Sequence, residues 1–337
     1  MKAAIVGGSG YLGVELLRLL AGHDEFEIAR VQAETAAGTL VGDLYPGLHA
    51  AYAELVYEPV DLDALAGCDV VFVAVPSGAS QAIVASLVGR VGCVVDLGAD
   101  FRLKDTSLYP TWYGFEHQEP ALVASAVYGL VELNRPALIG ASLIAAPGCY
   151  VTAASLGLAP LVAGGFVADD AVIVDGASGT SGAGRVPTPD THHAVVNENF
   201  SAYRVISHRH TPEMEQAIGA PVLFTPHLVP MTRGILTTSY ARSAGPTSSA
   251  ALTQALRDAY AGEPFVAVVD DPPSTRDVYA TNNARIAARY DERTGRIVVL
   301  CAIDNLTKGG AGQAIQAANV ALGVRETTGL PVVAVAP

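Results

Sequence analysis

The sequence predicts an α/β fold with two domains, and three observations support it. Short β-branched apolar runs alternate with Ala/Leu-rich stretches over roughly the first 150 residues, a pattern typical of a parallel sheet covered on both faces. A glycine-rich loop joins the first apolar run to the first helical stretch. After Pro147 a series of strands is interrupted by single helices, which indicates a second, α+β region.

The periodicity and turn residues predict the individual elements. In the first region the predicted helices are Tyr11–Leu20 and Ala79–Val88, and the predicted strands are Ala3–Val6, Phe26–Gln32, Asp69–Val75, Val91–Leu97 and Leu138–Ala145. In the second region the predicted helices are Tyr150–Val162 and Leu252–Tyr260, and the predicted strands are Val172–Asp175, Val222–Phe224, Gly234–Tyr240, Phe265–Val269, Arg285–Tyr290 and Arg296–Ile303. The last two strands form a hairpin. A final Ala-rich helix, Ala311–Leu322, has small residues that suit close packing against the first domain.

Length, charge and cysteine content exclude several classes of protein. The chain has 337 residues, enough for about two domains. No apolar run is long enough to predict a transmembrane helix, and the first strand leads straight into the glycine loop without room for a secretory signal. Four cysteines in such a chain favour a reduced, cytoplasmic setting. A net charge of −13 without any Lys/Arg cluster argues against nucleic-acid binding.

The glycine loop predicts a dinucleotide site. It fits G-x-G-x-x-G and consists of Gly8, Ser9, Gly10, Tyr11, Leu12 and Gly13. Between a strand and a helix, such glycines permit a tight turn and close approach to a pyrophosphate, which the helix N-terminus binds. A purely structural turn is the alternative. Glu34, about 20 residues further on, would bind the adenosine ribose and favour NAD.

Cys149 is the candidate nucleophile. It follows Pro147 and Gly148 at a predicted helix start, where the free N–H groups favour a thiolate and can hold an oxyanion. A buried packing role is the alternative, and it suits the other three cysteines, Cys68, Cys93 and Cys301, which lie in or beside apolar strands.

His208 and His210 are candidate proton-transfer partners for this thiol. Two residues apart, they share one face if the segment is extended. Thr211 and Pro212 predict the N-cap and first residue of the next helix, so the histidines could simply precede a helix start. A zinc site with Cys149 is a weaker alternative, because no metal-ligand spacing accompanies these residues.

Three arginines lie where an anion could bind. Arg102 follows a predicted strand end, Arg185 closes a Gly/Ser-rich loop that begins at Ser178, and Arg233 precedes a predicted strand. Carboxyl ends of strands and glycine-rich backbone nests are common anion sites in such folds. Each of these residues could equally be an ordinary surface arginine.

Together these segments resemble the N-acetyl-γ-glutamyl-phosphate reductase family of the aspartate-semialdehyde dehydrogenase-like group. The matching stretches are Gly7–Leu20, Asp96–Leu103, Ala146–Pro160, Ser178–Arg185, His208–Gln216, Phe224–Leu236 and Asp304–Gln316. The resemblance implies a Rossmann-type NADP-binding domain, residues 1–147 and 312–337, completed by the C-terminal helix. It implies an inserted catalytic and oligomerisation domain, residues 148–311, and a homodimer or homotetramer without a metal.

The resemblance also implies roles for individual residues in NADPH-dependent reduction of N-acetylglutamyl phosphate, a step of arginine biosynthesis. Cys149 would form a thioester and expel phosphate, and hydride transfer would then yield the semialdehyde. His208 is assigned as the acid/base, with His210 and Glu213 as supporting residues. Substrate anions would bind Arg102, Arg185 and Ser178, and the cofactor would contact the glycine loop, Ser77 and Asn305.

The chain departs from the family pattern at a few positions. Gly98 stands where the family commonly has Ser, residues 280–282 read Ala-Thr-Asn rather than Gly-Ser-Asn, and residues 309–311 read Gly-Gly-Ala rather than Gly-Ala-Ala. A reductase of carrier-protein-linked aminoadipyl or glutamyl phosphate is therefore an alternative, as is a non-catalytic dinucleotide-binding regulator. For the cofactor we follow the resemblance, NADP, over the NAD signal of Glu34, because Thr35 or Thr39 could contact the adenosine phosphate.

Overall fold

The computed structural model describes residues 1–168, 170 and 172–335. The chain divides into two compact units. Unit 1 consists of Met1–Pro147 and Gly310–Leu330, and unit 2 consists of Gly148–Gly309 with the segment that begins at Pro331. In that segment, the Asn282 N–H donates to the Pro331 carbonyl at 2.8 Å. Residues 336–337, the end of the segment predicted to join the first domain, lie outside the described residues.

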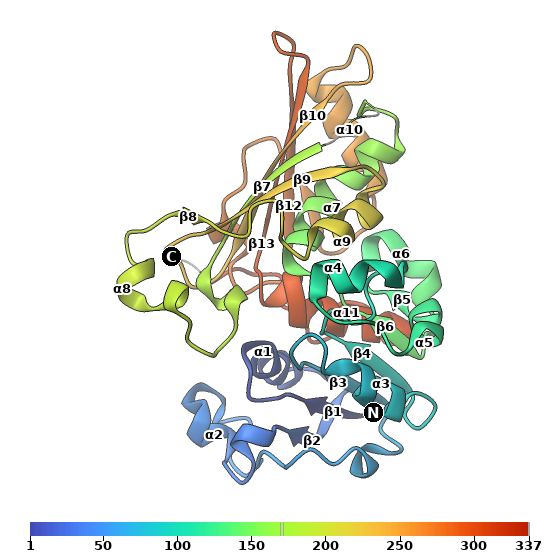
Figure 1. The fold of residues 1–337 in the computed structure, drawn as a ribbon, viewed down its shortest axis with the longest axis vertical. Coiled ribbons are helices and arrows are strands. Elements are labelled where there is room, and N and C mark those ends of the chain that lie inside the picture. The colour runs from blue at the N-terminus through green and yellow to red at the C-terminus, as the bar shows by residue number, and fades with distance from the viewer. Residues whose placement is uncertain (169, 171, 336–337) are drawn as a thin grey trace. The chain divides into compact units, whose positions relative to one another are not determined.

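Unit 1 contains a six-stranded parallel sheet in the order β2-β1-β3-β4-β6-β5 (Figure 1). The strands are β1 (Lys2–Val6), β2 (Glu27–Gln32), β3 (Val70–Val73), β4 (Cys93–Asp96), β5 (Val127–Tyr128) and β6 (Leu143–Ala145). In β3 and β4 every residue is buried, as expected for strands covered on both faces. The chain departs from β1 toward β2 on one side and returns to β3 on the other, so the carboxyl ends of β1 and β3 form the switch point where such sheets bind ligands.

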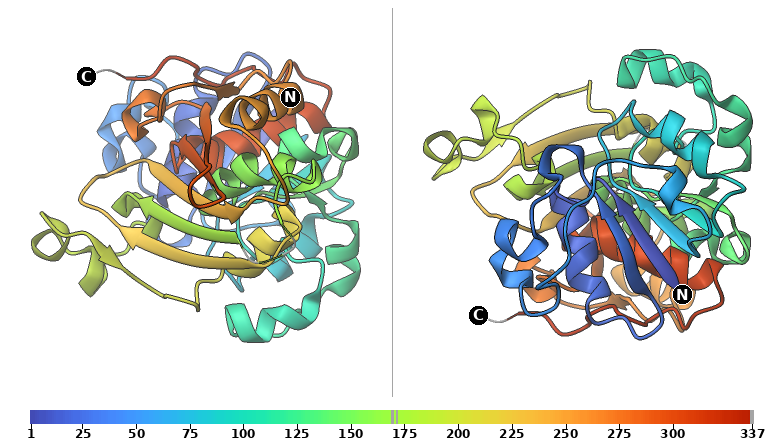
Figure 2. Two further views of the ribbon diagram at one scale, coloured as in Figure 1. Left: turned by 90° about the horizontal axis from the view of Figure 1, so that it is seen from above. Right: turned by 90° about the horizontal axis from the view of Figure 1, so that it is seen from below.

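The main helices of unit 1 are α1 (Tyr11–Leu20), α3 (Ser80–Leu87), α6 (Val131–Leu138) and α11 (Gly312–Ala321). Although it comes from the end of the chain, α11 contacts α1, α6 and β4, and Figure 2 shows it in red beside the blue strands. Shorter helices are α2 (Val41–Leu44), α4 (Tyr109–Tyr113) and α5 (Pro120–Ser125). The predicted Rossmann-type fold with a C-terminal completing helix is confirmed.

One predicted strand of this unit is wrong over its first five residues, 138–142. The sequence predicts a strand over Leu138–Ala145, but Leu138 is the last residue of α6 and only Leu143–Ala145 forms β6. The apolar run contains a turn, because Gly140 has a φ of 73° and Ile139 is exposed. Leu138 is buried as a residue of α6, so its apolar side chain serves the packing of this helix and does not belong to a strand.

The described residues of unit 2 form a seven-stranded mixed sheet in the order β11-β12-β13-β10-β7-β9-β8. The strands are β7 (Val172–Ser178), β8 (Ser201–Ala202), β9 (Val222–Leu228), β10 (Ile235–Arg242), β11 (Val266–Val268), β12 (Ala284–Asp291) and β13 (Arg296–Ile303). The hairpin predicted across residues 291–295 joins β12 and β13, whose register pairs Asp291 with Arg296. The helices are α7 (Cys149–Ala163), α8 (His193–Val196), α9 (Thr211–Ile218) and α10 (Ser249–Ala259).

Helices cover one face of this sheet and leave side chains of the other exposed. Contacts join α7 to β10, β12 and β13, while α9 contacts β9 and α10 contacts β12. Along β7 and β9 buried residues alternate with less buried ones, as in a sheet with one solvated face. Ile173, Leu223 and Tyr240 are paired neighbours on β7, β9 and β10, and all three are exposed.

Within the described ranges, no helix combines the length and the apolar character needed to cross a membrane.

Candidate active site

Cys149 is the first residue of α7, and Gly148 is the N-cap. Gly148 is extended, with φ −70° and ψ 147°, which turns the chain out of the preceding loop into the helix. The first N–H groups of a helix have no intrahelical acceptor, and the positive end of its dipole lies there. A thiol at this position experiences a field that favours the thiolate.

Cys149 also differs from the other cysteines in exposure. Cys149 is partly exposed, whereas Cys68, Cys93 and Cys301 are buried. Burial raises the pKa of both Cys93 and Cys301 to about 12. These two thiols are therefore protonated at neutral pH, and they are packing residues as the sequence predicts.

His210 lies directly against the start of α7. A Cβ placed on Gly148 would come within 2.5 Å of His210 Nε2, so the imidazole occupies the space that any larger residue would need. Glu213, fully buried in the first turn of α9, accepts a hydrogen bond from the Gly148 N–H at 2.8 Å. The turn that carries Cys149 is thus held by two residues of the His208–Glu213 segment.

The two histidines do not form an extended segment. His210 is helical in conformation and is the N-cap of α9, so the predicted N-cap, Thr211, is instead its first residue. The His210 N–H donates to His208 Nδ1 at 3.1 Å, and the ring centroids are 4.7 Å apart. A local turn, rather than strand alternation, brings the two imidazoles together.

His208 lies in an aromatic cage. Its ring meets those of Tyr150, Tyr203 and Phe224 edge-on, with centroids 5.2–5.8 Å apart. Burial, followed by the positive charges of Arg209 and Arg204, lowers the pKa of His208 to about 3. His208 is therefore neutral at physiological pH.

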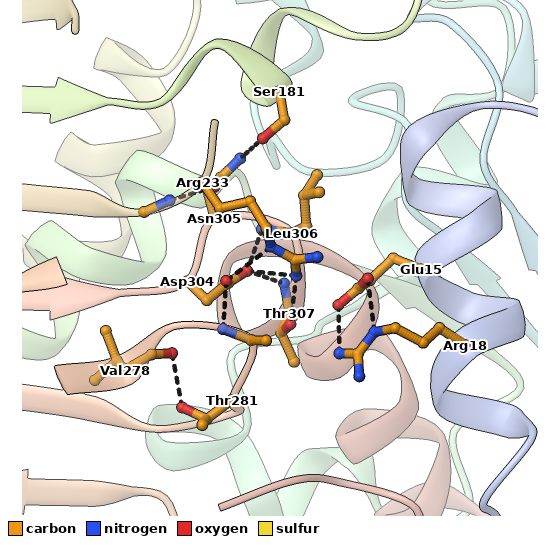
Figure 3. A network of polar contacts seen from close by, with 12 residues as sticks. Glu15, Arg18, Ser181, Arg233, Val278, Thr281, Asp304, Asn305, Leu306 and Thr307 are labelled. Carbon is orange, nitrogen blue, oxygen red and sulfur yellow. Dashed lines mark hydrogen bonds and ion pairs between the residues drawn. The ribbon is translucent and has the colours of Figure 1, made fainter. Parts of the chain in front are cut away.

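A second part of unit 2 surrounds the end of β7. Ser178 is buried, and its hydroxyl donates to the Gly179 carbonyl at 3.0 Å. Asn305 donates through Nδ2 to Ser181 Oγ at 3.0 Å and accepts from the Gly234 N–H at 2.7 Å (Figure 3). A Cβ on Gly182 would lie 3.3 Å from Ser178 Oγ and 3.7 Å from Asn305 Nδ2. The structure thus brings the predicted residues Ser178 and Asn305 close to one loop.

The two remaining arginine candidates of unit 2 have different surroundings. Arg185 is exposed and follows Gly184, whose φ of 88° requires glycine. Arg233 instead forms a bidentate ion pair with the buried Asp304, with both distances 2.9 Å (Figure 3). Ala280 also donates its N–H to Asp304 and has a φ of 58°, a conformation in which a Cβ costs about 1–2 kcal/mol.

In unit 1 the three glycines of the loop differ in what surrounds them. A Cβ on Gly8 would meet Val31 Cγ2 at 2.3 Å, and one on Gly13 would meet Gly8 Cα at 2.5 Å, so both are required by packing. At Gly10 the nearest neighbouring atom would be 3.7 Å away, which leaves its Cα accessible. Packing therefore does not require glycine at position 10, whereas close approach of a pyrophosphate would.

Ser77 lies on the loop between β3 and α3, at the switch point. A Cβ on Gly7 would come within 2.4 Å of the Ala74 carbonyl oxygen, so this loop contacts the glycine loop directly. Asp100 holds the same loop by accepting the N–H groups of Gly78 and Ser80 at 2.7 and 3.1 Å.

Arg102 is buried beside the ends of β4 and β6. Its guanidinium donates to the carbonyls of Ala146 and Leu97 at 2.8 and 3.0 Å. Burial and the neighbouring Asp100 charge raise the pKa of Asp96 to about 7, against the opposing charge of Arg102. A Cβ on Gly98 would lie 2.9 Å from Asp96 Oδ1 and 3.0 Å from Ser80 Oγ, so a larger residue there would displace one of these side chains.

Glu34 follows β2 and is exposed, and its carboxylate accepts the Val60 N–H at 3.3 Å. This contact joins Glu34 to a second loop of the unit. No group of three or more His, Cys, Asp or Glu residues among the described positions could hold a metal ion.

Sequence reasoning missed two buried carboxylates, Asp100 and Asp304. Both follow apolar strands, and both accept several backbone N–H groups in the loops that contain predicted site residues. An Asp just beyond a buried strand is the available signal, but it does not reveal which loop the side chain binds.

Comparisons with known proteins agree with this architecture. Residues 2–141 match the family model of the semialdehyde dehydrogenase NAD binding domain, and residues 149–305 match that of the semialdehyde dehydrogenase dimerisation domain. A solved aspartate semialdehyde dehydrogenase with NADP from Candida albicans superposes with a TM-score of 0.71 at 18% identity, covering 95% of this chain and 97% of that one. It shows the fold.

Two curated relatives are much more similar in sequence. The N-acetyl-gamma-glutamyl-phosphate reductase of Alkalilimnicola ehrlichii is 47% identical, covering 100% of both chains. The protein of the same name from Symbiobacterium thermophilum is 46% identical, covering 98% of this chain and 97% of its own. The chain therefore belongs to the N-acetyl-γ-glutamyl-phosphate reductase family of semialdehyde dehydrogenases.

Proposed function

We propose that this protein reduces N-acetyl-γ-glutamyl phosphate to N-acetylglutamate semialdehyde, releasing phosphate, through a thioester on Cys149. The observation that carries this proposal is the position of Cys149 at the start of α7, against His210 and Glu213. Full-length relatives at 46–47% identity bear the name of this activity.

The residues of unit 2 support a covalent route. The Cys149 thiolate attacks the acyl carbon, and the first N–H groups of α7 are suited to hold the oxyanion that forms. Collapse of this adduct breaks the carbon–oxygen bond to phosphate and leaves the thioester. NADPH, when bound, supplies the hydride that reduces the thioester.

We assign the acid/base role to His210 rather than to His208. His210 Nε2 lies against Gly148, beside the nucleophile, and can protonate the substrate oxygen and take the proton back when the carbon–sulfur bond breaks. His208 has a pKa of about 3 and its Nδ1 is occupied by the His210 N–H. These two facts support a positioning role for His208.

The remaining predicted residues take supporting roles in the proposal. Arg102 is held in place by two backbone carbonyls. Following the family resemblance, we assign the substrate's anionic and polar groups to Arg102, Arg185 and Ser178. Asn305 and Ser77 would contact the cofactor, together with Gly8, Ser9, Gly10, Tyr11, Leu12 and Gly13. We assign cofactor binding to residues 1–147 and 312–337, and catalysis to residues 148–311.

The cofactor fits the glycine loop. Gly10 has space at its Cα, and the loop ends at the N-terminus of α1, where a pyrophosphate binds favourably. The Glu34 carboxylate, the generic signal for NAD, accepts one hydrogen bond, from the Val60 N–H. These observations support a dinucleotide cofactor at this loop, and we take NADPH rather than NADH from the family resemblance.

The match to a dimerisation domain indicates that the chain oligomerises. We propose a homodimer that forms through the open face of the unit 2 sheet, where Ile173, Leu223 and Tyr240 are exposed in one cross-strand row. A thiolate nucleophile must stay reduced, which favours the cytoplasm as its compartment.

The first prediction tests the reaction itself. Purified protein should reduce NADP in the presence of N-acetylglutamate semialdehyde only when phosphate is added, and Cys149→Ser should lower kcat by at least about a thousandfold with NADPH binding intact. Activity would be followed at the nicotinamide absorbance band, with Cys301→Ser as the matched control. Full activity of the Cys149 variant, or a preference for carrier-linked substrates, would contradict the proposal.

The second prediction separates the histidines. His210→Asn should lower kcat by about 10²–10⁴-fold, whereas His208→Asn, whose amide oxygen can replace Nδ1 as acceptor, should lower it far less. The pH–rate profile of His208→Asn should keep the wild-type midpoint.

His208 should instead affect stability. Because folding lowers its pKa from 6.5 to about 3, His208 binds a proton in the unfolded chain but not in the folded chain between these two pH values. Its contribution to stability is present above pH 6.5 and is lost as the pH falls toward 3. The free energy of unfolding should fall less on acidification in His208→Asn. The assignment fails if His208→Asn alone abolishes activity.

The third prediction concerns the loop glycines. Gly10→Ala should leave the free energy of unfolding within about 1 kcal/mol of wild type but weaken NADPH binding by at least about tenfold. Gly13→Ala should destabilise the fold by about 2 kcal/mol, because its Cβ meets backbone atoms. Thermal unfolding and fluorescence titration measure the two effects. Unchanged NADPH affinity in Gly10→Ala, or better turnover with NADH, would show that the cofactor assignment is wrong.

The fourth prediction tests the dimer face. Leu223→Asp should raise the dimer Kd by at least about tenfold, since association would bury an unpaired charge. Ile139→Asp, at an exposed residue of unit 1, is the control and should leave the Kd unchanged. Light scattering across a dilution series measures the assembly. A Leu223 variant as dimeric as wild type would place the interface elsewhere.

A further inference from the structure

Arg233, for which the sequence left an anion-binding role and an ordinary surface role open, forms an ion pair within the protein. Its Nε donates to Asp304 Oδ2 and its Nη2 to Asp304 Oδ1, each at 2.9 Å, and Nη2 also donates to Thr307 Oγ1 at 2.9 Å (Figure 3). The Arg233 side chain is 14% exposed and the Asp304 side chain is fully buried. The Nε/Nη2 edge of the guanidinium, which could otherwise bind an anionic substrate in a bidentate manner, is directed at a carboxylate of the protein.

Asp304 in turn organises the turn that follows β13. Its Oδ1 accepts the N–H groups of Leu306 and Thr307 at 3.0 and 2.9 Å, and its Oδ2 accepts the Ala280 N–H at 2.8 Å. Its backbone carbonyl accepts the Gly309 N–H at 2.9 Å. The buried carboxylate therefore fixes residues 304–307, the backbone carbonyl of the same residue holds Gly309, and Arg233 neutralises the charge of the carboxylate.

This turn ends against the nucleophile. A Cβ on Gly309 would lie 2.8 Å from Cys149 Cβ and 3.2 Å from Cys149 Cα, so the Gly309 backbone is in contact with the cysteine. Asn305, the second residue of the turn, is held at both ends of its amide, by Gly234 and by Ser181. A shift of the turn would therefore move both the surface beside Cys149 and the Asn305 amide.

We propose that the Arg233–Asp304 pair is a positioning device, which holds the 304–309 turn against Cys149 and so sets the reactivity of the thiol. Its consequence for turnover rests on the proposed function, but its effect on the thiol does not. Arg233 acts through Asp304 and Gly309 and does not bind the substrate.

The test uses two variants that alter the pair in different ways. Arg233→Lys keeps the positive charge, but an ammonium cannot reproduce the planar fork that reaches both carboxylate oxygens and Thr307. Asp304→Asn keeps an oxygen acceptor and leaves Arg233 in place, but it removes the charge. Arg242→Lys is the matched control, because Arg242 forms an ion pair with Asp170 on the surface of the same unit. Arg242 is the last residue of β10 and pairs with Arg296, at the end of the strand far from Arg233.

The readout is the alkylation of Cys149 by iodoacetamide as a function of pH, followed by mass spectrometry of the Cys149 peptide. Both Arg233→Lys and Asp304→Asn should change the alkylation rate at neutral pH by at least about threefold, whereas Arg242→Lys should match wild type. In turnover, both should lower kcat by about tenfold or more with KM for the acyl phosphate within about twofold of wild type.

Two results would overturn the inference. One is an alkylation profile equal to wild type in both variants. The other is a selective rise of KM for the acyl phosphate and for phosphate in Arg233→Lys but not in Asp304→Asn, which would identify Arg233 as an anion-binding residue.

The alkylation result decides the question even if the protein proves to act on another substrate. Loss of an ion-pair partner inside a protein can unfold it. If either variant fails to melt cooperatively, Thr307→Val replaces it. That change removes one hydrogen bond of the guanidinium and should alter the alkylation rate in the same direction by a smaller factor, and an unchanged rate would count against the inference.

Discussion

The constraint on which the rest of the site depends is the absence of a side chain at Gly148. The space that a Cβ would fill is occupied by the His210 imidazole, and the Gly148 N–H donates a hydrogen bond to the buried Glu213 carboxylate. The same residue is the N-cap that directs the chain into α7, so it also fixes where Cys149 stands relative to the helix dipole. One small residue thus lets the nucleophile, the proposed acid/base and a buried carboxylate converge.

The two histidines have different roles in this account because of the burial of His208. The aromatic rings around His208 remove it from water and keep it neutral, so its Nδ1 can serve as a fixed acceptor for the His210 backbone. The 304–309 turn, which also contacts Cys149, is held by the Arg233–Asp304 pair. In unit 1 the same logic appears at Asp100, which fixes the loop that carries Ser77 by accepting two of its N–H groups. Buried acceptors of backbone N–H groups shape the candidate site throughout.

Much of the fold was predictable because its strands are apolar runs bounded by glycine and its first helix follows a glycine loop. The strand predicted over Leu138–Ala145 failed because an apolar run can belong to the end of a helix and the start of a strand in succession. For the site, position along the chain indicated Cys149, the histidines and the loop glycines. It could not reveal that Arg233 faces Asp304, or that His208 is too deeply buried to be charged, because both facts depend on contacts between residues distant in sequence.

The central claim is that Cys149 carries the acyl group. The most direct measurement is to mix the protein with N-acetyl-γ-glutamyl phosphate in the absence of NADPH and to analyse the quenched sample by peptide mass spectrometry. The account predicts an N-acetylglutamyl adduct on the peptide that contains Cys149, formed together with one equivalent of phosphate and discharged when NADPH is added. Phosphate release without an adduct, or an adduct on any other residue, would contradict it.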